Sequence, residues 1–443
     1  MAEVIPFIAS RPIPEYAAGY AALPYDVVSR KEAAEEIAAR PLSFLRIDKT
    51  TAIMPADMDE YDPCVYTRAQ ELLASDEQAG VIIPEPDGKP HYYVYQLARG
   101  GRTQTGVVAC ASVADYHNNV IKRHENTRTK KQQDRVEHIA VLKAHTGLVV
   151  LAYRPHEQID AAVSTAISGE PLYDFETADG MCHRVWRIDD ETITSDLRQA
   201  FAEIDALYIA DGHHRAAAAV IVEEQCGGEA PAPAAAPAAA PAPGEATSAA
   251  PAPAAARAAT GKPSNEAAFF LAMLFPAGQL TIHDYNRVVI DLNGYEPEAF
   301  LKMVGSIFEV AKAPDKHTPY RPRQKGELGM YLQGSWYRLN IPADMRVQDP
   351  VEGLDVSLLQ NHILDPVLDI KDPCTSKRLH CVSGVRGLQE LERHAKATGG
   401  VAFVLYPCSL EELFAVADAG ELMPPKSTWF EPKPRSGLFI HKI

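Results

Sequence analysis

The stretch 207–222 constrains the fold of this chain more than any other part of the sequence. A short apolar run with strand character is followed by Asp211 and Gly212, which predict a turn, and then by an alanine-rich segment that is typical of a helix. Because the first N–H groups of a helix have no partner within it, such a strand–turn–helix corner attracts anions. Phosphate is the commonest biological anion. The stretch therefore predicts a site that handles phosphate.

The side chains around this turn supply the predicted chemistry. Gly212 lets the backbone come close to a ligand, and Arg215 offers a bidentate fork that suits phosphate oxygens. Asp211, His213 and His214 add acid–base or metal-binding capacity. The alternative is a structural turn, since Asp-Gly is a common turn sequence, aspartate caps helices, and neighbouring histidines are often merely solvated.

Composition indicates an ordinary globular protein. With 443 residues and 46% hydrophobic side chains, the chain is long enough for two or three domains. Its net charge of −16 disfavours nucleic acid and anionic membranes as partners. The seven cysteines are scattered, and neither a secretory signal nor an apolar run of about 18 residues is present. We expect a cytoplasmic protein and leave a homo-oligomer open.

A second concentration of polar residues lies between residues 116 and 135. Its surplus of positive charge stands out in an acidic protein, and Asn126 with Thr127 interrupts the helical pattern. Glu125, beside His124, is predicted as a general base near bound phosphate, because it is a carboxylate surrounded by cations. A solvated basic helix face is the alternative. The neighbouring positions predicted to bind the ligand are Lys122, Arg123, Asn126 and Thr127.

A third candidate segment lies near the end of the sequence, at residues 423–433. Several prolines make this segment rigid and extended. Lys426, Ser427 and Thr428 offer a cation and two hydroxyls, which predicts a phosphate contact. A surface-exposed tail is the alternative.

The order of the predicted elements indicates an α+β fold in three parts. Residues 1–225 plus 265–293 are expected to form a phosphate- or nucleotide-binding core with a mixed sheet and flanking helices. Residues 226–264 are predicted to be a disordered insert, since alanine and proline dominate them. Residues 294–443 are expected to form a smaller α+β region whose tail returns to the site. A helix is predicted over 296–311.

Five motifs then identify a family resemblance. In chain order they are Pro24-Tyr-Asp-Val27, Lys122-Arg-His-Glu-Asn-Thr127 with Lys131 and Asp134-Arg135, Asp211-Gly-His-His-Arg215, Leu354-Asp-Val-Ser357 and Met423-Pro-Pro-Lys-Ser-Thr428. Together they resemble the uncharacterised family numbered 1015 among the domains of unknown function, over the whole chain except the insert. The Asp211–Arg215 element is also similar to the phosphate-binding element of the ParB/sulfiredoxin-like fold, notably in free serine kinases. This implies a sheet core of ParB/sulfiredoxin-like character.

The resemblance to free serine kinases also implies an activity. It implies a phosphotransferase that uses ATP or ADP with Mg²⁺ and acts on a small hydroxyl metabolite, with serine the best single candidate. In that scheme Gly212 and Arg215 hold phosphates, and Asp211 or a histidine supports Mg²⁺ or the transfer. Glu125 deprotonates the acceptor hydroxyl. Asn286 stands where related sequences tend to have histidine, and the absence of a Walker-type motif argues against a P-loop kinase.

Two other functions remain as hypotheses. One is a metal-dependent hydrolase of a phosphorylated small molecule, which would use Asp211, His213, His214 and His124. The other is a noncatalytic ParB-like binding or regulatory module. The enzymatic hypotheses share one geometric condition, namely that segments 122–128 and 211–215 close over the same anionic ligand.

Overall fold

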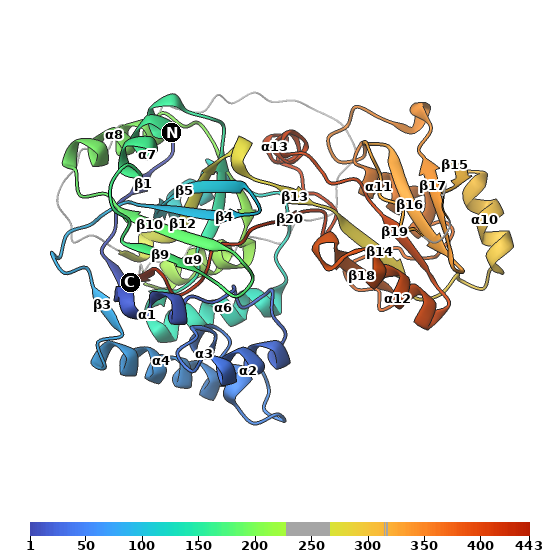
Figure 1. Ribbon diagram of the computed structural model, residues 1–443. Coiled ribbons are helices and arrows are strands. Elements are labelled where there is room, and N and C mark those ends of the chain that lie inside the picture. The colour runs from blue at the N-terminus through green and yellow to red at the C-terminus, as the bar shows by residue number, and fades with distance from the viewer. Residues whose placement is uncertain (227–265, 314, 316–317) are drawn as a thin grey trace, which may run out of the picture.

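The computed structural model describes residues 1–226, 266–313, 315 and 318–443. Apart from residue 226, the predicted disordered insert lies outside these residues. Two sheet-bearing lobes dominate the fold, one with a nine-stranded sheet and one with a six-stranded sheet (Figure 1). A mixed-sheet core with flanking helices and a smaller C-terminal α+β part is therefore confirmed.

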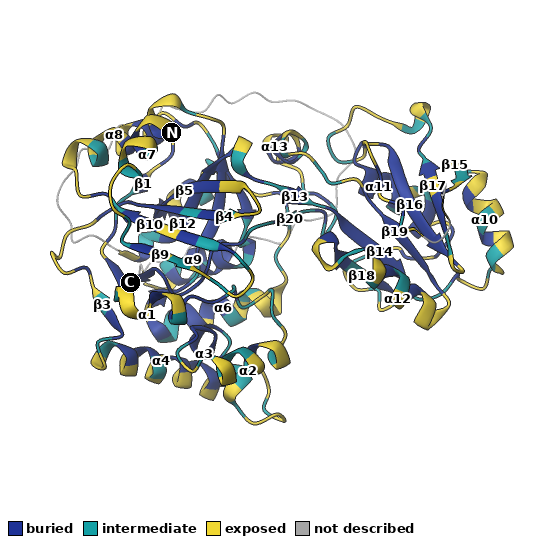
Figure 2. Cartoon of the chain, viewed as in Figure 1, coloured by how far each residue is buried: buried dark blue, intermediate teal, exposed yellow. Residues whose placement is uncertain are grey.

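The sheet of the first lobe is mixed. Its strands, in spatial order, are β6 (Ile121–Lys122), β11 (Leu207–Asp211), β8 (Val149–Tyr153), β12 (Phe269–Pro276), β5 (Arg102–Ser112), β4 (Tyr93–Arg99), β10 (Cys182–Arg187) and β9 (Tyr173–Glu176), with β1 (Val4–Ile5) on β5. The pairs β11–β6 and β12–β8 are parallel and the others antiparallel. Residues of both faces of this sheet are buried, so both faces need a covering layer (Figure 2).

Helices supply much of that layer. The α-helices are α1 (Pro14–Tyr20), α2 (Arg30–Ala39), α3 (Leu45–Asp48), α4 (Pro63–Gln78), α5 (Val113–His117), α6 (Thr129–Leu142), α7 (Glu157–Ala166), α8 (Glu191–Ala202), α9 (His213–Cys226), α10 (Pro297–Gly305), α11 (Asp355–Leu359), α12 (Leu388–Thr398) and α13 (Leu410–Asp418). Ala216 and Ala219 of α9 join the apolar cluster on one face of the sheet, while Ala218 and Val222 meet α6. Small side chains on both sides of α9 thus hold it between the sheet and α6.

The six-stranded sheet forms the second lobe. Its order is β15 (Glu309–Lys312), β17 (Ser335–Asn340), β16 (Glu327–Leu332), β19 (Val401–Val404), β14 (Tyr285–Val289) and β18 (Leu379–Ser383), and all of its pairs are antiparallel. Because β14 belongs to this sheet, the second lobe takes residues that the sequence assigned to the core at 265–293. The largest cluster of buried apolar side chains runs through both lobes.

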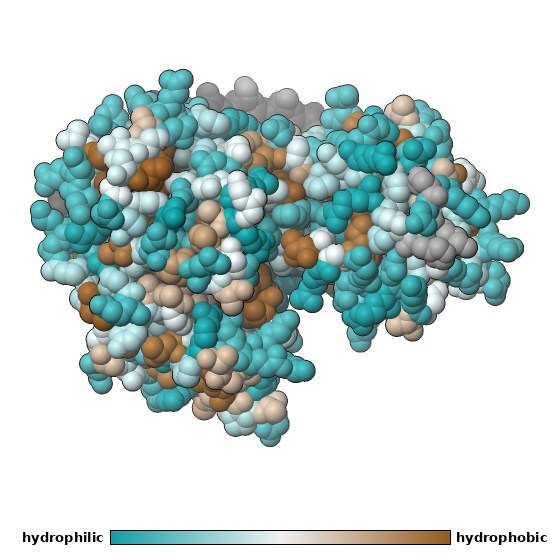
Figure 3. All heavy atoms as spheres, viewed as in Figure 1, coloured by the Kyte–Doolittle hydropathy of each residue, from teal (hydrophilic) through white to brown (hydrophobic). Residues whose placement is uncertain are grey.

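The last residues of the chain return to the first lobe. A four-stranded sheet joins β3 (Ile82–Pro84), β2 (Ala9–Pro12), β21 (Ile440–Lys442) and β7 (Ala144–His145), and a two-stranded sheet joins β13 (Ile282–His283) to β20 (Trp429–Phe430). Both chain ends therefore lie in the same lobe (Figure 1). The face shown in Figure 3 is largely hydrophilic and is hollowed between the two lobes.

Several local predictions can be compared directly with these elements. The sequence places Glu32 three residues after Ser29, which predicts a capping box, and this box is confirmed at the start of α2; a second box caps α13 through Ser409. The helix predicted over 296–311 is wrong beyond Gly305, because residues 309–312 pair with β17 as strand β15. No helix among the described residues is long and apolar enough to cross a membrane.

Candidate functional site

The corner between β11 and α9 has the geometry that the sequence predicts. Strand β11 ends at Asp211, and helix α9 begins at His213. Gly212 joins them with a φ of +96°, a region that side chains with a Cβ rarely adopt, and its carbonyl accepts a 3.0 Å hydrogen bond from the amide of Ala216. Gly212 is thus the N-cap of α9 and has no side chain to cover the helix N-terminus.

Arg215 binds the protein itself at this corner. Its Nη1 donates to the carbonyl of Leu148, and its Nη2 lies 2.6 Å from Asp211 Oδ2. The guanidinium also lies against Gly212, where a Cβ would be 3.1 Å from Nε. The Arg215 guanidinium, predicted as a free bidentate donor to phosphate, instead makes hydrogen bonds within the protein that stabilise the turn.

Asp211 is similarly engaged by cations. Its Oδ1 accepts from Lys433 Nζ and its Oδ2 from Arg215, and all three side chains are largely shielded from solvent. Burial raises the pKa of Asp211, but Lys433 and Arg215 outweigh that effect and hold the pKa well below its usual range. Each oxygen of the carboxylate already binds one cation, and these two cations would compete with the Mg²⁺ predicted there.

A cavity of about 110 Å³ opens beside this corner. It is lined by residues of five separate segments: Tyr25, Asp26, Val27, Glu125, Arg128, Lys131, Ala210, Asp211, Gly212, His213, His214, Arg215, Tyr285, Lys426, Thr428, Trp429 and Lys433. Five of these are cationic and three are carboxylates. Segments 122–128 and 211–215 thus face one common space, as the enzymatic hypotheses require.

Five of the predicted ligand-binding residues do not line this cavity. They are Lys122, Arg123, Asn126, Thr127 and Ser427. Lys122 binds Asp418 at 2.7 Å, and Arg123 lies 5.3 Å from the ring centre of Tyr116. Ser427 donates its hydroxyl to a backbone carbonyl of its own turn. Lys122, Arg123 and Ser427 therefore make contacts away from the cavity. Of the polar segment 116–135, only Glu125, Arg128 and Lys131 line the cavity.

The segment 423–433 enters the site because two contacts fix it there. The amide of Met423 donates to the carbonyl of His124 at 2.8 Å. Arg287, which is only 1% exposed, donates to the carbonyls of Pro425 and Lys426 at 2.9 and 3.0 Å. Lys426 itself has a φ of 60°, so this turn holds a non-glycine residue in the left-handed region. The anchoring role of Arg287 and the ion pair of Lys433 were missed, since neither has a local sequence signal.

Glu125 is the carboxylate best placed for proton transfer. Burial raises its pKa, and the nearby Lys426 ammonium opposes that rise. Lys426 lies 5.7 Å from the ring centre of Tyr285. Among the described residues, Arg128, Lys131 and Lys426 form no salt bridge with a carboxylate, so their charges remain available to a ligand.

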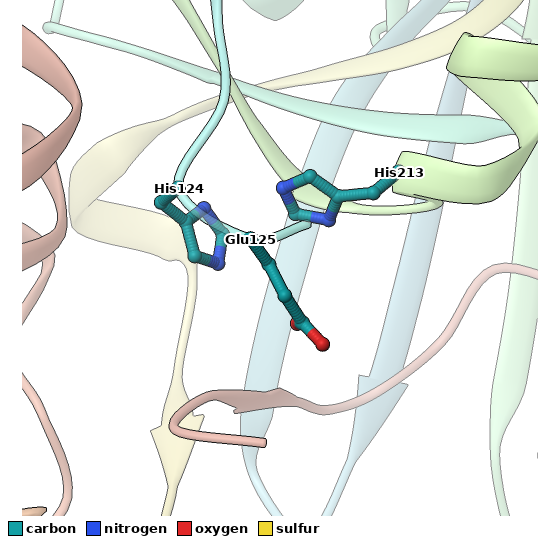
Figure 4. A group of neighbouring side chains, drawn as sticks. All are labelled: His124, Glu125 and His213. Atoms are coloured by element: carbon teal, nitrogen blue, oxygen red, sulfur yellow. The ribbon is translucent and has the colours of Figure 1, made fainter. Parts of the chain in front are cut away.

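Three histidines surround the corner in different environments. Burial lowers the pKa of His124 to about 4 and holds that of His213 well below its usual value, so both rings are neutral at pH 7. Their ring centres are 4.5 Å apart at an interplanar angle of 86° (Figure 4). Nε2 of His124 lies 3.2 Å from Oγ1 of Thr428. His214 differs, because its Nε2 accepts a 2.9 Å hydrogen bond from the amide of Arg128.

The fold and the site define a two-lobed protein with a cation-lined cavity at a strand–glycine–helix corner. The chain belongs to the family described as "Protein of unknown function (DUF1015)", whose model matches residues 4–357. The family resemblance seen in the sequence motifs is therefore confirmed. No curated protein matches the chain significantly.

Several solved structures resemble the chain at low similarity. A free serine kinase in complex with AMP is 12% identical, covers 75% of this chain and 90% of that chain, and has a TM-score of 0.33. A mutant free serine kinase in complex with ADP is 12% identical, with 76% of this chain and 91% of that chain covered and a TM-score of 0.34. A C-terminally truncated SbnI from Staphylococcus aureus is 9% identical, with 75% of this chain and 87% of that chain covered and a TM-score of 0.34. TM-scores this low do not indicate a shared activity. The ParB/sulfiredoxin-like character of the core stays a prediction.

Proposed function

We propose that this protein is a nucleotide-dependent phosphotransferase that acts on a small hydroxyl compound, with free serine the first candidate. One observation carries the proposal. A half-buried carboxylate, three cations that form no salt bridge with any described residue and the N-terminus of α9 face the same small cavity. Phosphoryl transfer needs positioning and charge neutralisation more than covalent chemistry, and this combination provides both.

Each group has a distinct role in this proposal. The backbone N–H groups at the start of α9 and the ammonium of Lys426 bind phosphate oxygens. Arg128 and Lys131, at the cavity edge, neutralise the remaining charge. Glu125 accepts the proton of the acceptor hydroxyl, since a carboxylate with a raised pKa is a stronger base.

Mg²⁺ is proposed as the ion that accompanies the nucleotide phosphates. Because Asp211 is engaged by two cations, Asp26 is the cavity carboxylate that would hold this ion. Asp26 is exposed and forms no salt bridge among the described residues, which suits an ion that keeps several of its waters. When bound, Mg²⁺ neutralises charge on the phosphate oxygens.

The lining of the cavity indicates which part of a nucleotide it would bind. Its volume is about 110 Å³ and charged side chains form much of its lining, which suits phosphate groups better than a nucleoside. A second cavity of about 330 Å³ adjoins it and shares Tyr25, Asp26 and Lys131. Tyr61 and Tyr66 also line this second cavity, and we place the base there because aromatic rings offer stacking surfaces.

Product formation tests the proposal directly. Purified protein is incubated with Mg²⁺, with ATP or ADP, and with serine or a panel of other small hydroxyl compounds, and phosphorylated product is measured by ³¹P NMR. We expect phosphoserine or another phosphomonoester with one of the nucleotides. Lys426→Met should raise the KM for the nucleotide, whereas Lys122→Met, outside the cavity, should leave it unchanged. Failure with every acceptor and both nucleotides would remove the proposal.

A further inference from the structure

Three potential metal ligands converge beside the phosphate cavity. One nitrogen each from His124 and His213 and one carboxylate oxygen of Glu125 lie within 4.8 Å of one another. The two histidines are buried, and Glu125 is half-buried. In Figure 4 the ring of His213 points from the start of α9 toward the loop that carries His124 and Glu125. The cluster therefore joins two segments that are far apart in the sequence.

Each of the two rings has one nitrogen without a hydrogen bond. Nε2 of His213 and Nδ1 of His124 are buried and have no hydrogen-bond partner among the described residues. An unpaired buried nitrogen is unfavourable, so one on each of two neighbouring rings needs an explanation. Thr428 contacts the other nitrogen of His124 at 3.2 Å. A neutral imidazole carries one proton on its two nitrogens, so each ring keeps one nitrogen that is able to bind a metal ion.

We propose that His124, Glu125 and His213 bind a divalent transition metal ion, for which Zn²⁺ is the probe. Two neutral imidazoles and one carboxylate form a ligand set typical of zinc and related ions, with a further position left open. The hydroxyl of Thr428 orients the His124 ring as an outer-shell partner. Neither Asp211 nor His214 belongs to this site, although both were ligands in the hydrolase hypothesis, because each is already engaged within the protein.

This site does not depend on the proposed phosphotransferase activity, but it constrains that activity. Glu125 cannot accept a proton as a free base while it is bound to a metal ion. Occupancy by Zn²⁺ and transfer through Glu125 are therefore mutually exclusive, and excess Zn²⁺ should inhibit the transferase. Zn²⁺ binding itself needs no substrate, so failure of either proposal can be recognised without the other.

Binding of Zn²⁺ to the full chain is measured by competition with a chromogenic chelator, after the cysteine thiols have been alkylated. His213→Gln should weaken the affinity by more than the roughly 10–100-fold that loss of an outer-shell partner costs, and Thr428→Val should weaken it within that range. His214→Gln is the matched control, since it removes the adjacent histidine but no proposed ligand. His91→Gln tests a second histidine cluster, formed with Asp87 and Asp189 at the surface.

One measurement needs no variant and remains decisive if His213→Gln fails to fold. X-ray absorption of the unalkylated wild-type protein with one equivalent of Zn²⁺ should show nitrogen and oxygen ligands, including two imidazoles. Sulfur ligands or a single imidazole would overturn the assignment. So would wild-type affinity in folded His213→Gln, or an equal loss of affinity in His91→Gln.

Discussion

Replacing Asp211 by asparagine should destabilise the first lobe strongly, because it leaves two shielded cations without a counter-charge. The side chains of Lys433 and Arg215 are 6% and 10% exposed, and both bind Asp211. Removing one partner of a buried ion pair costs about 3–5 kcal/mol. Asp211→Asn affects two cations at once, so we expect a loss near the upper end of that range.

Asp418 provides a matched control at the surface. Its carboxylate also binds two cations, Lys122 at 2.7 Å and Arg154 at 2.9 Å, but the aspartate side chain is 36% exposed. Solvent screens such a pair, so Asp418→Asn should cost about 1 kcal/mol or less. The difference between the two variants should therefore be at least about 2 kcal/mol.

Urea titration at pH 7 measures both variants, with tryptophan fluorescence as the signal, since Lys433 lies 5.1 Å from the ring centre of Trp429. The pKa of Asp211 is lowered in the folded state, so its stabilising effect should be complete above the ordinary aspartate value of about 3.9 and should decline as the pH falls below it. Equal free energies of unfolding for the two variants would refute the assignment of Asp211 as a buried counter-ion. A large loss that persists unchanged at pH 2 would contradict its electrostatic origin.

Three further predictions follow from the site. Glu125→Gln, which keeps the side-chain volume nearly constant, should lower the turnover number for phosphotransfer by about 10²–10⁴-fold. The wild-type rate should rise with pH through a pKa above the usual glutamate value. A pH-independent wild-type rate would exclude Glu125 as the base. Gly212→Ala should lower the free energy of unfolding in urea by about 1–3 kcal/mol, since a φ of +96° is strained for alanine and Arg215 occupies the space that the new Cβ would need. Gly278→Ala is the control, because nothing lies within 4 Å of a Cβ at that position. Arg287→Leu should cost about 1.5–3 kcal/mol and raise the KM for nucleotide, because the 424–427 turn loses its anchor; an unchanged KM would separate that turn from the site.

Local features of the fold were predictable because their determinants are adjacent in the sequence. The turn at Gln333 and Gly334, both with positive φ, joins β16 to β17, and a glycine between two short runs with strand character is itself a hairpin signal. The Ser29 capping box needs only Glu32 three residues later. The helix over 296–311 failed because apolar residues beyond Gly305 fit either a helix or a strand, and pairing with β17 decided between them.

The site was predictable only as a set of segments. The sequence motifs indicate that Glu125, Gly212 and Lys426 share a function, and all three line one cavity. The state of each side chain depends on partners that are remote in the sequence. Lys433 reaches Asp211 across 222 positions, and no pattern around Asp211 specifies that contact. The same applies to Arg215, which was predicted to bind phosphate but donates a hydrogen bond to the carbonyl of Leu148.

The late position of residues 423–433 has a consequence for biosynthesis. Since Lys426, Thr428 and Lys433 form one wall of the cavity, a nascent chain that stops at residue 422 carries only the opposite wall. Asp211, which pairs with Arg215, then lacks its second cation, Lys433, until that residue has been synthesised. Ligand binding should accordingly appear only after residues 423–433 have left the ribosome, and premature termination should yield a product unable to retain phosphate.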